Sequence, residues 1–596
     1  MVAGVRALIR RTMTTVAATA VVSLALFMML GALGHALAPK WQVRPFADHI
    51  VPATSDTTIQ AKDRATGGAL STPQEGAYQT KETHITVKLD GGVTVNAIVR
   101  EPIGAPNDHP ACLFLHGSGT GKSSEAYGDV AGAMASAGIT TLVPDKRLDN
   151  YTMLNRDYVS SARDYAKSLA ILRSWPGVDA SKTGLYAESE GTWIATVLTT
   201  EHPEIAFAIL TSPPVVSGRR QMTLAATNYL ADAGAPDAVK RLIPRITSLG
   251  TRHIGLAYAD FDAAKYRRSL TMPLLINYGV RDDAMPVEQG ARLLIRAANK
   301  AGNTNVTLRY YDANHQLRTG SNKTVPELPL ERHYTHDLED WVNAVADGTG
   351  ASDWTTPMVA GARPDQKIAA PTSTKPGLVS SLDEVIAAIA GCLLFAALAT
   401  VGSLMLLGAG LTRRLRSGDG FGRTGSSRMP AGNPNAAEGL ACGPRNPCNP
   451  LETRRFPTAL RAALSVNVVL AVGTTCVFLA YLVTVIRDAI ALTSDSALLA
   501  RNWNFVASAA RLGVVAFAWL AVELVATFLE RRHTKDGVSK ANTSKAVTEK
   551  GHRAMTEIRY VNGKAGIGFG HVAVATFVVS SAALSLALLA FWGLFV

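Results

Sequence analysis

Long apolar stretches separate one globular-looking region from the rest of the chain. Each stretch is long enough to cross a bilayer as a helix, which takes about 20 residues. The stretches lie near residues 14–38, 385–411, 463–486, 505–529 and 568–596. The pattern therefore predicts an N-terminal transmembrane anchor (1–38), a C-terminal four-helix transmembrane region (384–596), and a globular domain between them.

Strand-like and helix-like patterns alternate in the globular region. A hairpin with Asp90-Gly91-Gly92 at its turn comes first, and apolar runs separated by amphipathic stretches follow. The candidate strands are 83–87, 93–99, 111–117, 140–145, 182–188, 207–212, 273–279 and 306–312. Parallel strands covered by helices on both faces read as continuous apolar runs, as most of these do. The alternation predicts an α/β domain at 79–346 with a mainly parallel sheet and helices on both faces.

Three segments fall outside that alternation. Residues 216–270 are too many for a simple connection between strands and contain several helical stretches. We expect this insertion to be a cap over the carboxyl ends of the strands, where such sheets bind ligands. Residues 39–78 and 347–383 are rich in small and polar residues, and we expect linkers there.

The chain carries a formal net charge of +12, and the placement of the basic residues indicates what this charge does. Arginine and lysine cluster before the first apolar stretch and in the loops 412–461 and 530–567. Basic residues favour the cytoplasmic side of a membrane. We therefore expect a multi-pass cell-membrane protein with five transmembrane helices, a cytoplasmic N-terminus, both loops cytoplasmic and the domain 79–346 extracytoplasmic. Nucleic-acid binding by the loops is the alternative, but because the charge follows the topology we expect no nucleic-acid partner.

The first apolar stretch could instead be a cleaved signal peptide. Ala36-Leu37-Ala38 resembles a signal-peptidase site. Pro39 directly after it disfavours cleavage, so we expect an uncleaved anchor. Either outcome exports the globular domain.

Cysteine and histidine give no metal-binding pattern. Of the five cysteines, only Cys112 lies in the globular domain, so no disulfide is expected within it. Cys442 and Cys448 match no zinc spacing. The histidines that match no metal-ligand spacing are His84, His253, His333 and His336. We expect neither a metal nor a cofactor.

Residues 114–123, FLHGSGTGKS, admit two interpretations. The Gly-Lys-Ser end is typical of a phosphate-binding loop, G-x-x-x-x-G-K-[ST]. However, His116 occupies the position of the first glycine, and nucleotides are scarce outside the cytoplasm. The other interpretation is a His-Gly turn whose backbone N–H groups hold an oxyanion, and it requires a nucleophile further along the chain.

Residues 184–193, GLYAESEGTW, supply a candidate nucleophile. Ser189 directly follows a candidate strand, and Gly191 lies two residues beyond it. This nearly matches the nucleophile elbow G-x-S-x-G, in which a serine sits on a sharp strand-to-helix turn. Ala187 stands where glycine is usual, and alanine is small enough for such a turn.

An acid and a histidine follow in the order that a serine nucleophile requires. Asp282 lies just after the strand 273–279, with Asp283 as an adjacent competitor, and His315 lies in the loop after the strand 306–312. The three side chains therefore come from the carboxyl ends of three different strands. In a catalytic triad the histidine takes the proton of the serine, and the acid orients the imidazole ring.

Residues 80–346 resemble the α/β-hydrolase superfamily, in particular its dienelactone-hydrolase and prolyl-oligopeptidase-like branches. The resemblance rests on the motifs HGSG, AESEG, GVRDD and NHQL. It implies an eight-stranded core and hydrolysis or acyl transfer at a carboxyl group, but no particular substrate. The expected roles are Ser189 as nucleophile, His315 as base, Asp282 as its acid, and the backbone N–H groups of Ser118 and Glu190 as the oxyanion hole.

Other polar residues near these motifs have structural explanations. We expect the side chains of Glu188 and Glu190 to bond to neighbouring backbone, and we expect Lys146, which follows a strand, to be structural. In the fourth apolar stretch, Glu523 is expected to contact another helix, with Asn467 as a candidate partner.

The sequence thus favours a membrane-bound, extracytoplasmic serine hydrolase that acts on carboxylic esters or thioesters as an esterase, lipase or acyltransferase. Its expected partner is a small-molecule or lipid-like acyl substrate. One alternative is an exported peptidase of the prolyl-oligopeptidase-like type, although the segment before the core is too short for the large extra domain that those enzymes usually carry. The other is a membrane sensor or transport component whose hydrolase-fold domain only binds, because four C-terminal spans are more than an anchor needs.

Overall fold

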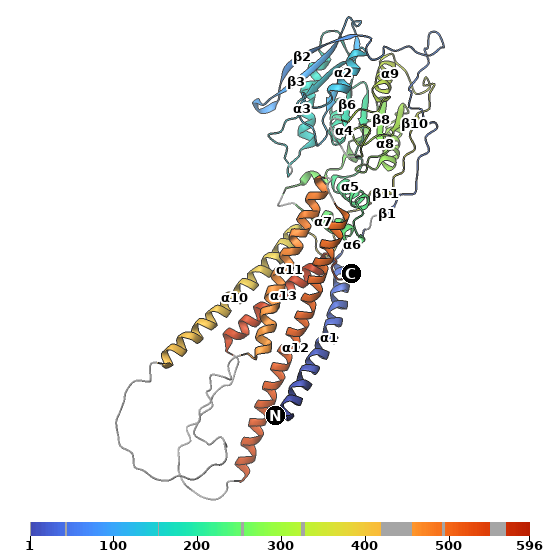
Figure 1. The fold of residues 1–596 in the computed structure, drawn as a ribbon. Coiled ribbons are helices and arrows are strands. Elements are labelled where there is room, and N and C mark those ends of the chain that lie inside the picture. Colours follow the sequence, from blue (N-terminus) through green and yellow to red (C-terminus); the bar gives the residue numbers. More distant parts are fainter. Residues whose placement is uncertain are drawn as a thin grey trace. The chain divides into compact units, whose positions relative to one another are not determined.

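A central β-sheet organises the globular region between the first two apolar helices (Figure 1). The computed structural model describes residues 2–41, 44–152, 154–251, 255–322, 328–418, 456–491, 495–548 and 568–596. In these ranges the main sheet has nine strands in the order β2-β3-β5-β4-β6-β7-β8-β9-β10. The strands are β2 Gln79–Lys88, β3 Thr94–Ile103, β4 His109–Leu115, β5 Thr140–Pro144, β6 Val178–Glu188, β7 Ala208–Thr211, β8 Leu274–Gly279, β9 Val306–Tyr311 and β10 Val359–Gly361.

The pairing of these strands gives the expected fold class. Strand β3 runs antiparallel to both β2 and β5, and every pairing from β5 to β10 is parallel. The domain is therefore an α/β-hydrolase fold, as the sequence motifs implied. The sheet has one strand more than the eight expected, because β10 pairs with the edge strand β9 from within the predicted linker 347–383.

Helices cover both faces of the sheet and divide the apolar core into two layers. Residues of α3, α4 and α8 pack on one face, and residues of α2 and α9 pack on the other. These helices are α2 Gly128–Ser136, α3 Tyr158–Arg173, α4 Gly191–Glu201, α8 Val287–Lys300 and α9 Tyr334–Ala346. Because side chains alternate across a strand, neighbouring residues of β4 serve different layers: Leu113 faces the first and Phe114 the second.

The insertion between β7 and β8 is helical, as its sequence pattern indicated. It contains three α-helices and, from residue 257 on, short 3-10 turns. The α-helices are α5 Gly218–Asp232, α6 Asp237–Lys240 and α7 Leu242–Ser248. Arg219 at the start of α5 binds Asp260 and the backbone oxygens of Thr247 and Leu249, and so ties the insertion together.

The segments 39–78 and 347–383 differ from the linkers expected there, because large parts of both pack on the domain. Ile50 and Ile59 belong to the two core layers, and β10 extends the sheet. A separate two-stranded sheet pairs β1 (Arg44–Pro45) with β11 (Ile368–Ala369). The two segments thus contact each other through the pairing of β1 with β11.

Two buried charged residues hold these segments in place. Arg309 of β9 is fully buried, and its guanidinium donates to the backbone oxygens of Thr57 at 2.7 Å and Pro357 at 3.0 Å. Glu288 of α8 is also fully buried, and its carboxylate accepts from the backbone N–H groups of Ile50 and Gln366. A buried charge needs such hydrogen bonds, which explains why small polar sequences on both flanks adopt fixed conformations.

Outside the globular domain, the described residues form a second compact unit with five helices that are long and apolar enough to cross a membrane. They are α1 Val2–Leu37, α10 Leu382–Gly418, α11 Thr458–Ala491, α12 Ser496–Thr548 and α13 Phe569–Phe591. Residues 419–455 of the first predicted loop, including Cys442 and Cys448, and residues 549–567 of the second lie outside the described residues, as does His253. The second loop was expected to begin at residue 530, but α12 continues to Thr548.

Short polar side chains join these helices to one another. Asn467 of α11 donates to the backbone oxygen of Ala516 on α12 at 2.8 Å, and Thr475 of α11 bonds to Ser585 of α13 at 2.9 Å. Asn467 does not bond to Glu523, whose described hydrogen bond comes from Trp519 one turn earlier on α12. Buried polar groups of this kind fix the packing of helices in apolar surroundings.

Candidate active site

Ser189 lies on a sharp turn between β6 and α4. Its backbone has φ of 53°, a left-handed conformation that is unusual for a residue with a side chain. Its N–H donates to Thr211 O on the neighbouring strand β7 at 2.8 Å, and its own carbonyl accepts from Thr192 N at 3.0 Å. These bonds hold a strained serine at the carboxyl end of the sheet, which is the geometry of a nucleophile elbow.

The small residues around Ser189 are required by close packing. A Cβ atom at Gly191 would lie 2.6 Å from Leu115 O, at the end of β4. Glycine therefore allows the first turn of α4 to approach the neighbouring strand. Ala187 is fully buried within β6, paired with Leu115 and Leu210, and its methyl group fits where the sequence motif usually has glycine.

Asp282 and His315 come together from loops that follow β8 and β9. His315 Nδ1 lies 2.7 Å from Asp282 Oδ2, and Asp282 Oδ1 accepts from Ala284 N at 2.9 Å. Both carboxylate oxygens are thus occupied. Because a carboxylate only accepts, Nδ1 of His315 carries the proton, and Nε2 is left to accept another one when the ring is neutral.

A glycine makes the approach of these two loops feasible. A Cβ atom at Gly279, the last residue of β8, would lie 2.2 Å from Asn314 O. In the other loop, the Asn314 side chain accepts from Gln316 N at 2.9 Å and from Arg318 N at 3.1 Å, which turns the chain tightly around His315. The sequence motifs GVRDD and NHQL therefore form one compact corner.

Backbone atoms of both Ser189 and His315 form hydrogen bonds to residues at the end of β7. Ser189 N donates to Thr211 O, and Ser212 Oγ of the next residue donates to His315 O at 2.7 Å. Among the described residues no hydrogen bond joins Ser189 Oγ to His315. In hydrolases such a bond commonly tightens only when substrate is bound.

The HGSG turn lies directly beside the elbow. A Cβ atom at Gly117 would be 3.2 Å from Ser189 Cβ. His116 is buried and fastens this turn, with Nε2–H donating to Pro144 O at 2.8 Å and Nδ1 accepting from Thr120 Oγ1 at 3.1 Å. Burial lowers the pKa of His116 to about 4, so its ring is neutral and serves as a fixed support.

Lys146 links this turn to Glu190. Its buried ammonium donates to Gly117 O at 2.5 Å and lies 3.5 Å from Glu190 Oε2. Gly117 O and Ser118 N–H belong to one peptide group and point in opposite directions. Holding the oxygen therefore fixes the direction of the Ser118 N–H, one of the two N–H groups predicted for an oxyanion hole.

The Glu190 carboxylate is the centre of a buried polar network. Oε1 accepts from Arg156 Nη1 and from Tyr158 OH, each at 2.7 Å, and Oε2 accepts from Tyr151 OH. Burial alone would raise the pKa of Glu190, but Lys146 and Arg156 hold it below its usual value. The expected bonds to neighbouring backbone are thus replaced by bonds to side chains from the 146–158 region.

Glu188, on the other side of Ser189, faces the histidine loop. It is buried, and burial raises its pKa to about 7, although His315 and Arg318 oppose the rise. Among the described residues, no hydrogen bond joins the Glu188 carboxylate to neighbouring backbone, so the expected bond is not formed.

The adjacent acid Asp283 points to different partners. Burial and the neighbouring Asp232 of α5 raise its pKa to about 7. Asn228 and Gln221, also on α5, donate to the backbone oxygens of Asp283 and Ala284 at 2.9 and 2.5 Å. The helical insertion therefore holds the loop that carries Asp282 through hydrogen bonds. Of the two aspartates, Asp282 is the one whose carboxylate bonds to His315.

Comparison with known proteins adds little to this geometry. No protein-family model and no curated protein matches the sequence. An esterase of Pyrococcus furiosus matches with 18% identity over 49% of this chain and 96% of its own, at a TM-score of 0.31. A candidate dienelactone hydrolase of Klebsiella pneumoniae matches with 12% identity over 46% and 100%, at 0.32. Bacterial brefeldin A esterase matches with 14% identity over 47% and 80%, at 0.30. The fold assignment rests on the strand order, not on these likenesses.

Proposed function

We propose that this chain is a membrane-bound serine hydrolase that cleaves carboxylic ester or thioester bonds. One observation carries the proposal: the Asp282–His315 hydrogen bond lies at the same end of the sheet as the strained Ser189 turn. Isolated polar residues on three separate loops have no structural reason to be arranged in this way. A nucleophile, a base and an orienting acid do.

The proposed reaction uses these groups in two steps. Ser189 Oγ bonds to the carbonyl carbon while its proton passes to His315 Nε2, and Asp282 stabilises the resulting imidazolium. The tetrahedral intermediate then collapses, the bond to the alcohol or thiol breaks, and that leaving group takes the proton from His315. In the second step His315 removes a proton from water, the hydroxide attacks the acyl-serine, and the carboxylic acid leaves as Ser189 regains its proton.

Two backbone N–H groups are proposed to hold the oxyanion. Ser118 N–H lies in the HGSG turn beside Ser189, and Glu190 N–H lies at the start of α4, where helix N–H groups favour negative charge. One such donor is worth about 3 kcal/mol of transition-state stabilisation. The side chains of Lys146 and Glu190 would fix both donors at once, since Lys146 binds the Gly117–Ser118 peptide and Glu190 binds Lys146.

The membrane context bears on the substrate. Five helices could span a bilayer, and the basic residues that flank them favour an extracytoplasmic globular domain. A catalytic domain tethered near lipid encounters amphiphilic acyl compounds, so a lipid-like ester is the proposed substrate class.

The assay compares esters with amides on the purified full-length protein in detergent. We expect turnover of p-nitrophenyl esters of several chain lengths and little turnover of peptide anilides. Hydrolysis of anilides faster than esters would favour the peptidase alternative. Tight binding of an acyl compound without any turnover would favour the sensor or transport alternative.

Activity is expected to fall as the pH drops through the pKa of His315. Burial alone would lower that pKa, but the Asp282 carboxylate, with Glu188 nearby, raises it above the usual 6.5. Because His315 must be neutral to take a proton, kcat/KM should rise with pH, with the midpoint of its acid limb above 6.5. A pH profile of kcat/KM measures this midpoint, and a wild-type midpoint below the usual value would contradict the assignment.

Replacing Lys146 by methionine is expected to lower kcat by about 100-fold with little change in KM. Methionine keeps the buried chain but leaves the Gly117–Ser118 peptide free to turn, and small misplacement of a catalytic group costs on the order of this factor. The matched control is Lys122→Met in the loop after β4, where the exposed lysine pairs with Glu125 and should not matter. Equal effects of both changes, or a change in KM alone, would contradict the positioning role.

A further inference from the structure

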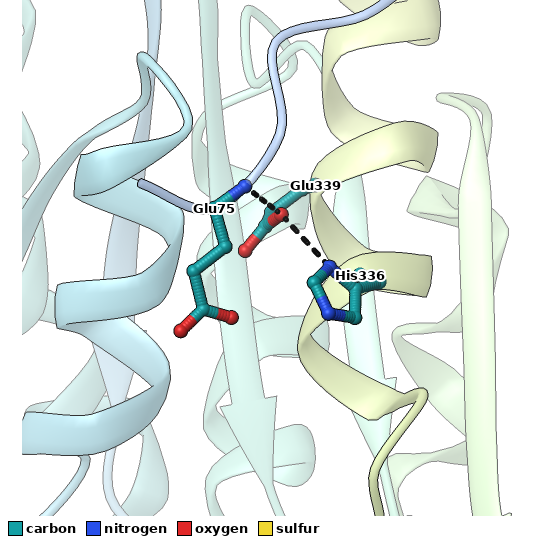
Figure 2. Close-up of side chains that lie close together, drawn as sticks. All are labelled: Glu75, His336 and Glu339. Atoms are coloured by element: carbon teal, nitrogen blue, oxygen red, sulfur yellow. Dashed lines mark hydrogen bonds and ion pairs between the residues drawn. The ribbon is translucent and has the colours of Figure 1, made fainter. Parts of the chain in front are cut away.

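Glu75, His336 and Glu339 form a cluster that shares no residue with the proposed triad. His336 and Glu339 lie three residues apart on one face of α9, and Glu75 comes from the segment that runs beside that helix (Figure 2). One ligand atom from each residue lies within 4.8 Å of the others. Figure 2 shows the three side chains around a common space.

Glu339 is the unusual member of this cluster. Its side chain is completely buried, and its Oε1 atom has no hydrogen-bond partner. Its Oε2 atom accepts from Glu75 N at 2.9 Å and lies 3.6 Å from His336 Nδ1. Within the described ranges no lysine or arginine forms an ion pair with Glu339. A buried carboxylate oxygen without a partner is costly, and a bound cation would remove that cost.

We infer that Glu75, His336 and Glu339 bind a divalent transition-metal ion such as Zn²⁺. Two carboxylates and one imidazole are a ligand set that such ions accept, and three protein ligands leave one position for water. Ligand atoms around tetrahedral zinc lie about 3.4 Å apart when each bond is about 2.1 Å. Glu75 and His336 are exposed, so their side chains can rotate to bring their ligand atoms closer to the buried Glu339.

The ion would pin the N-terminal flank of the domain to α9. The same segment already bonds there: Thr72 and Gln74 both donate to Asp340, and Asn343 donates to the backbone oxygen of Pro73. A metal ion that bridges Glu75 and α9 would stabilise these hydrogen bonds between the segment and the helix. The role is therefore structural, and it does not depend on the proposed hydrolase activity.

The first test measures metal binding by the purified full-length protein in detergent. Equilibrium dialysis against Zn²⁺ should give one more bound equivalent in the wild type than in His336→Ala, and Zn²⁺ should raise the melting temperature of the wild type only. Co²⁺ distinguishes this site from adventitious cysteine ligation. Binding here should give visible d–d bands that depend on His336, without the strong near-ultraviolet thiolate band.

Matched variants separate ligation from general attraction of cations to an acidic surface. Glu339→Gln and His336→Ala should each weaken Zn²⁺ binding at this site by about tenfold or more, since each removes a ligand. Asp347→Asn and His333→Ala change the same residue types at the two ends of α9 without removing a ligand, and they should bind as the wild type does. His336 is exposed, so its replacement leaves the fold intact even if the buried Glu339→Gln change does not.

Three results would overturn the inference. One is that the wild type and His336→Ala bind the same number of Zn²⁺ equivalents with the same affinity. Another is that Asp347→Asn weakens binding as much as His336→Ala, which would indicate surface charge alone. The third is that none of Zn²⁺, Co²⁺ and Ni²⁺ binds.

Discussion

Replacing Ser189 by alanine is expected to lower kcat for a p-nitrophenyl ester by roughly 10⁴- to 10⁶-fold. Alanine removes the only atom that bonds to the substrate carbonyl in the proposed mechanism, while the backbone bonds from Ser189 N to Thr211 O and from Thr192 N to Ser189 O remain. The fold should therefore survive, and KM should change little. Steady-state kinetics and a melting curve of the detergent-solubilised protein measure both quantities.

A second serine on the same strand provides the control. Ser181 is exposed near the start of β6, where its hydroxyl bonds to Asp179. Ser181→Ala should therefore hydrolyse the ester at the wild-type rate. If Ser189→Ala retained more than about a hundredth of wild-type kcat, a far smaller loss than removal of a nucleophile causes, Ser189 could not be the nucleophile.

The second large effect is expected from Asp282→Asn, which should lower kcat by about 10³- to 10⁴-fold. An asparagine cannot stabilise the imidazolium, and its amide group can turn its NH₂ toward His315 and impose the wrong tautomer on the ring. The midpoint of the acid limb of the pH profile should also move to lower pH, because the carboxylate that raises the pKa of His315 is gone.

Asp283→Asn is the matched comparison for that change. Asp283 lies beside Asp232 and not beside His315, so removing its charge should change kcat by less than about threefold on the scale of ordinary surface changes. Relief of the repulsion with Asp232 should keep or raise the melting temperature. Loss of activity in Asp283→Asn with retention in Asp282→Asn would reverse the assignment of the acid.

The strands could be predicted because their signal is local. Each of the eight candidate strands coincides with one of β2–β9. The strands β4–β9 are buried and parallel, and such strands are continuous apolar runs bounded by turn residues. The antiparallel pair β2 and β3 is marked instead by the hairpin turn at Asp90-Gly91-Gly92. The ninth, β10, is three residues long, and its only fully buried side chain is the methyl group of Ala360. A run this short inside a Pro- and Thr-rich segment has no distinctive pattern.

The fixed flanks could not be predicted because their partners are far away in sequence. Arg309 is bound by Thr57 O and Thr58 O, and Glu288 by Ile50 N, across about 240 or 250 residues. A segment of small polar residues has the same composition whether it is a flexible linker or packs over buried charged side chains. Linkers were expected at 39–78 and 347–383 because of the composition of these segments. Their structure is decided instead by specific buried hydrogen bonds, which composition does not reveal.

The candidate site also has a part that could be predicted from the sequence and a part that could not. Ser189, Asp282 and His315 each follow a recognisable strand, so their common edge could be inferred from the order of motifs. The roles of Lys146 and of the Glu190 side chain could not, because they depend on a contact between two loops at 3.5 Å and on the direction of one peptide group. The signal in the sequence was a lysine, Lys146, shortly after a buried strand, together with an acid, Glu190, beside the candidate nucleophile.

The most direct measurement of the central claim is covalent labelling of the full-length protein with a fluorophosphonate, followed by mass spectrometry of its peptides. Such probes react with a serine whose hydroxyl is activated by a neighbouring base. We expect one adduct, on Ser189, that is absent from Ser189→Ala and forms much more slowly in Asp282→Asn. An adduct on another residue, or labelling of Ser189→Ala at the wild-type rate, would contradict it.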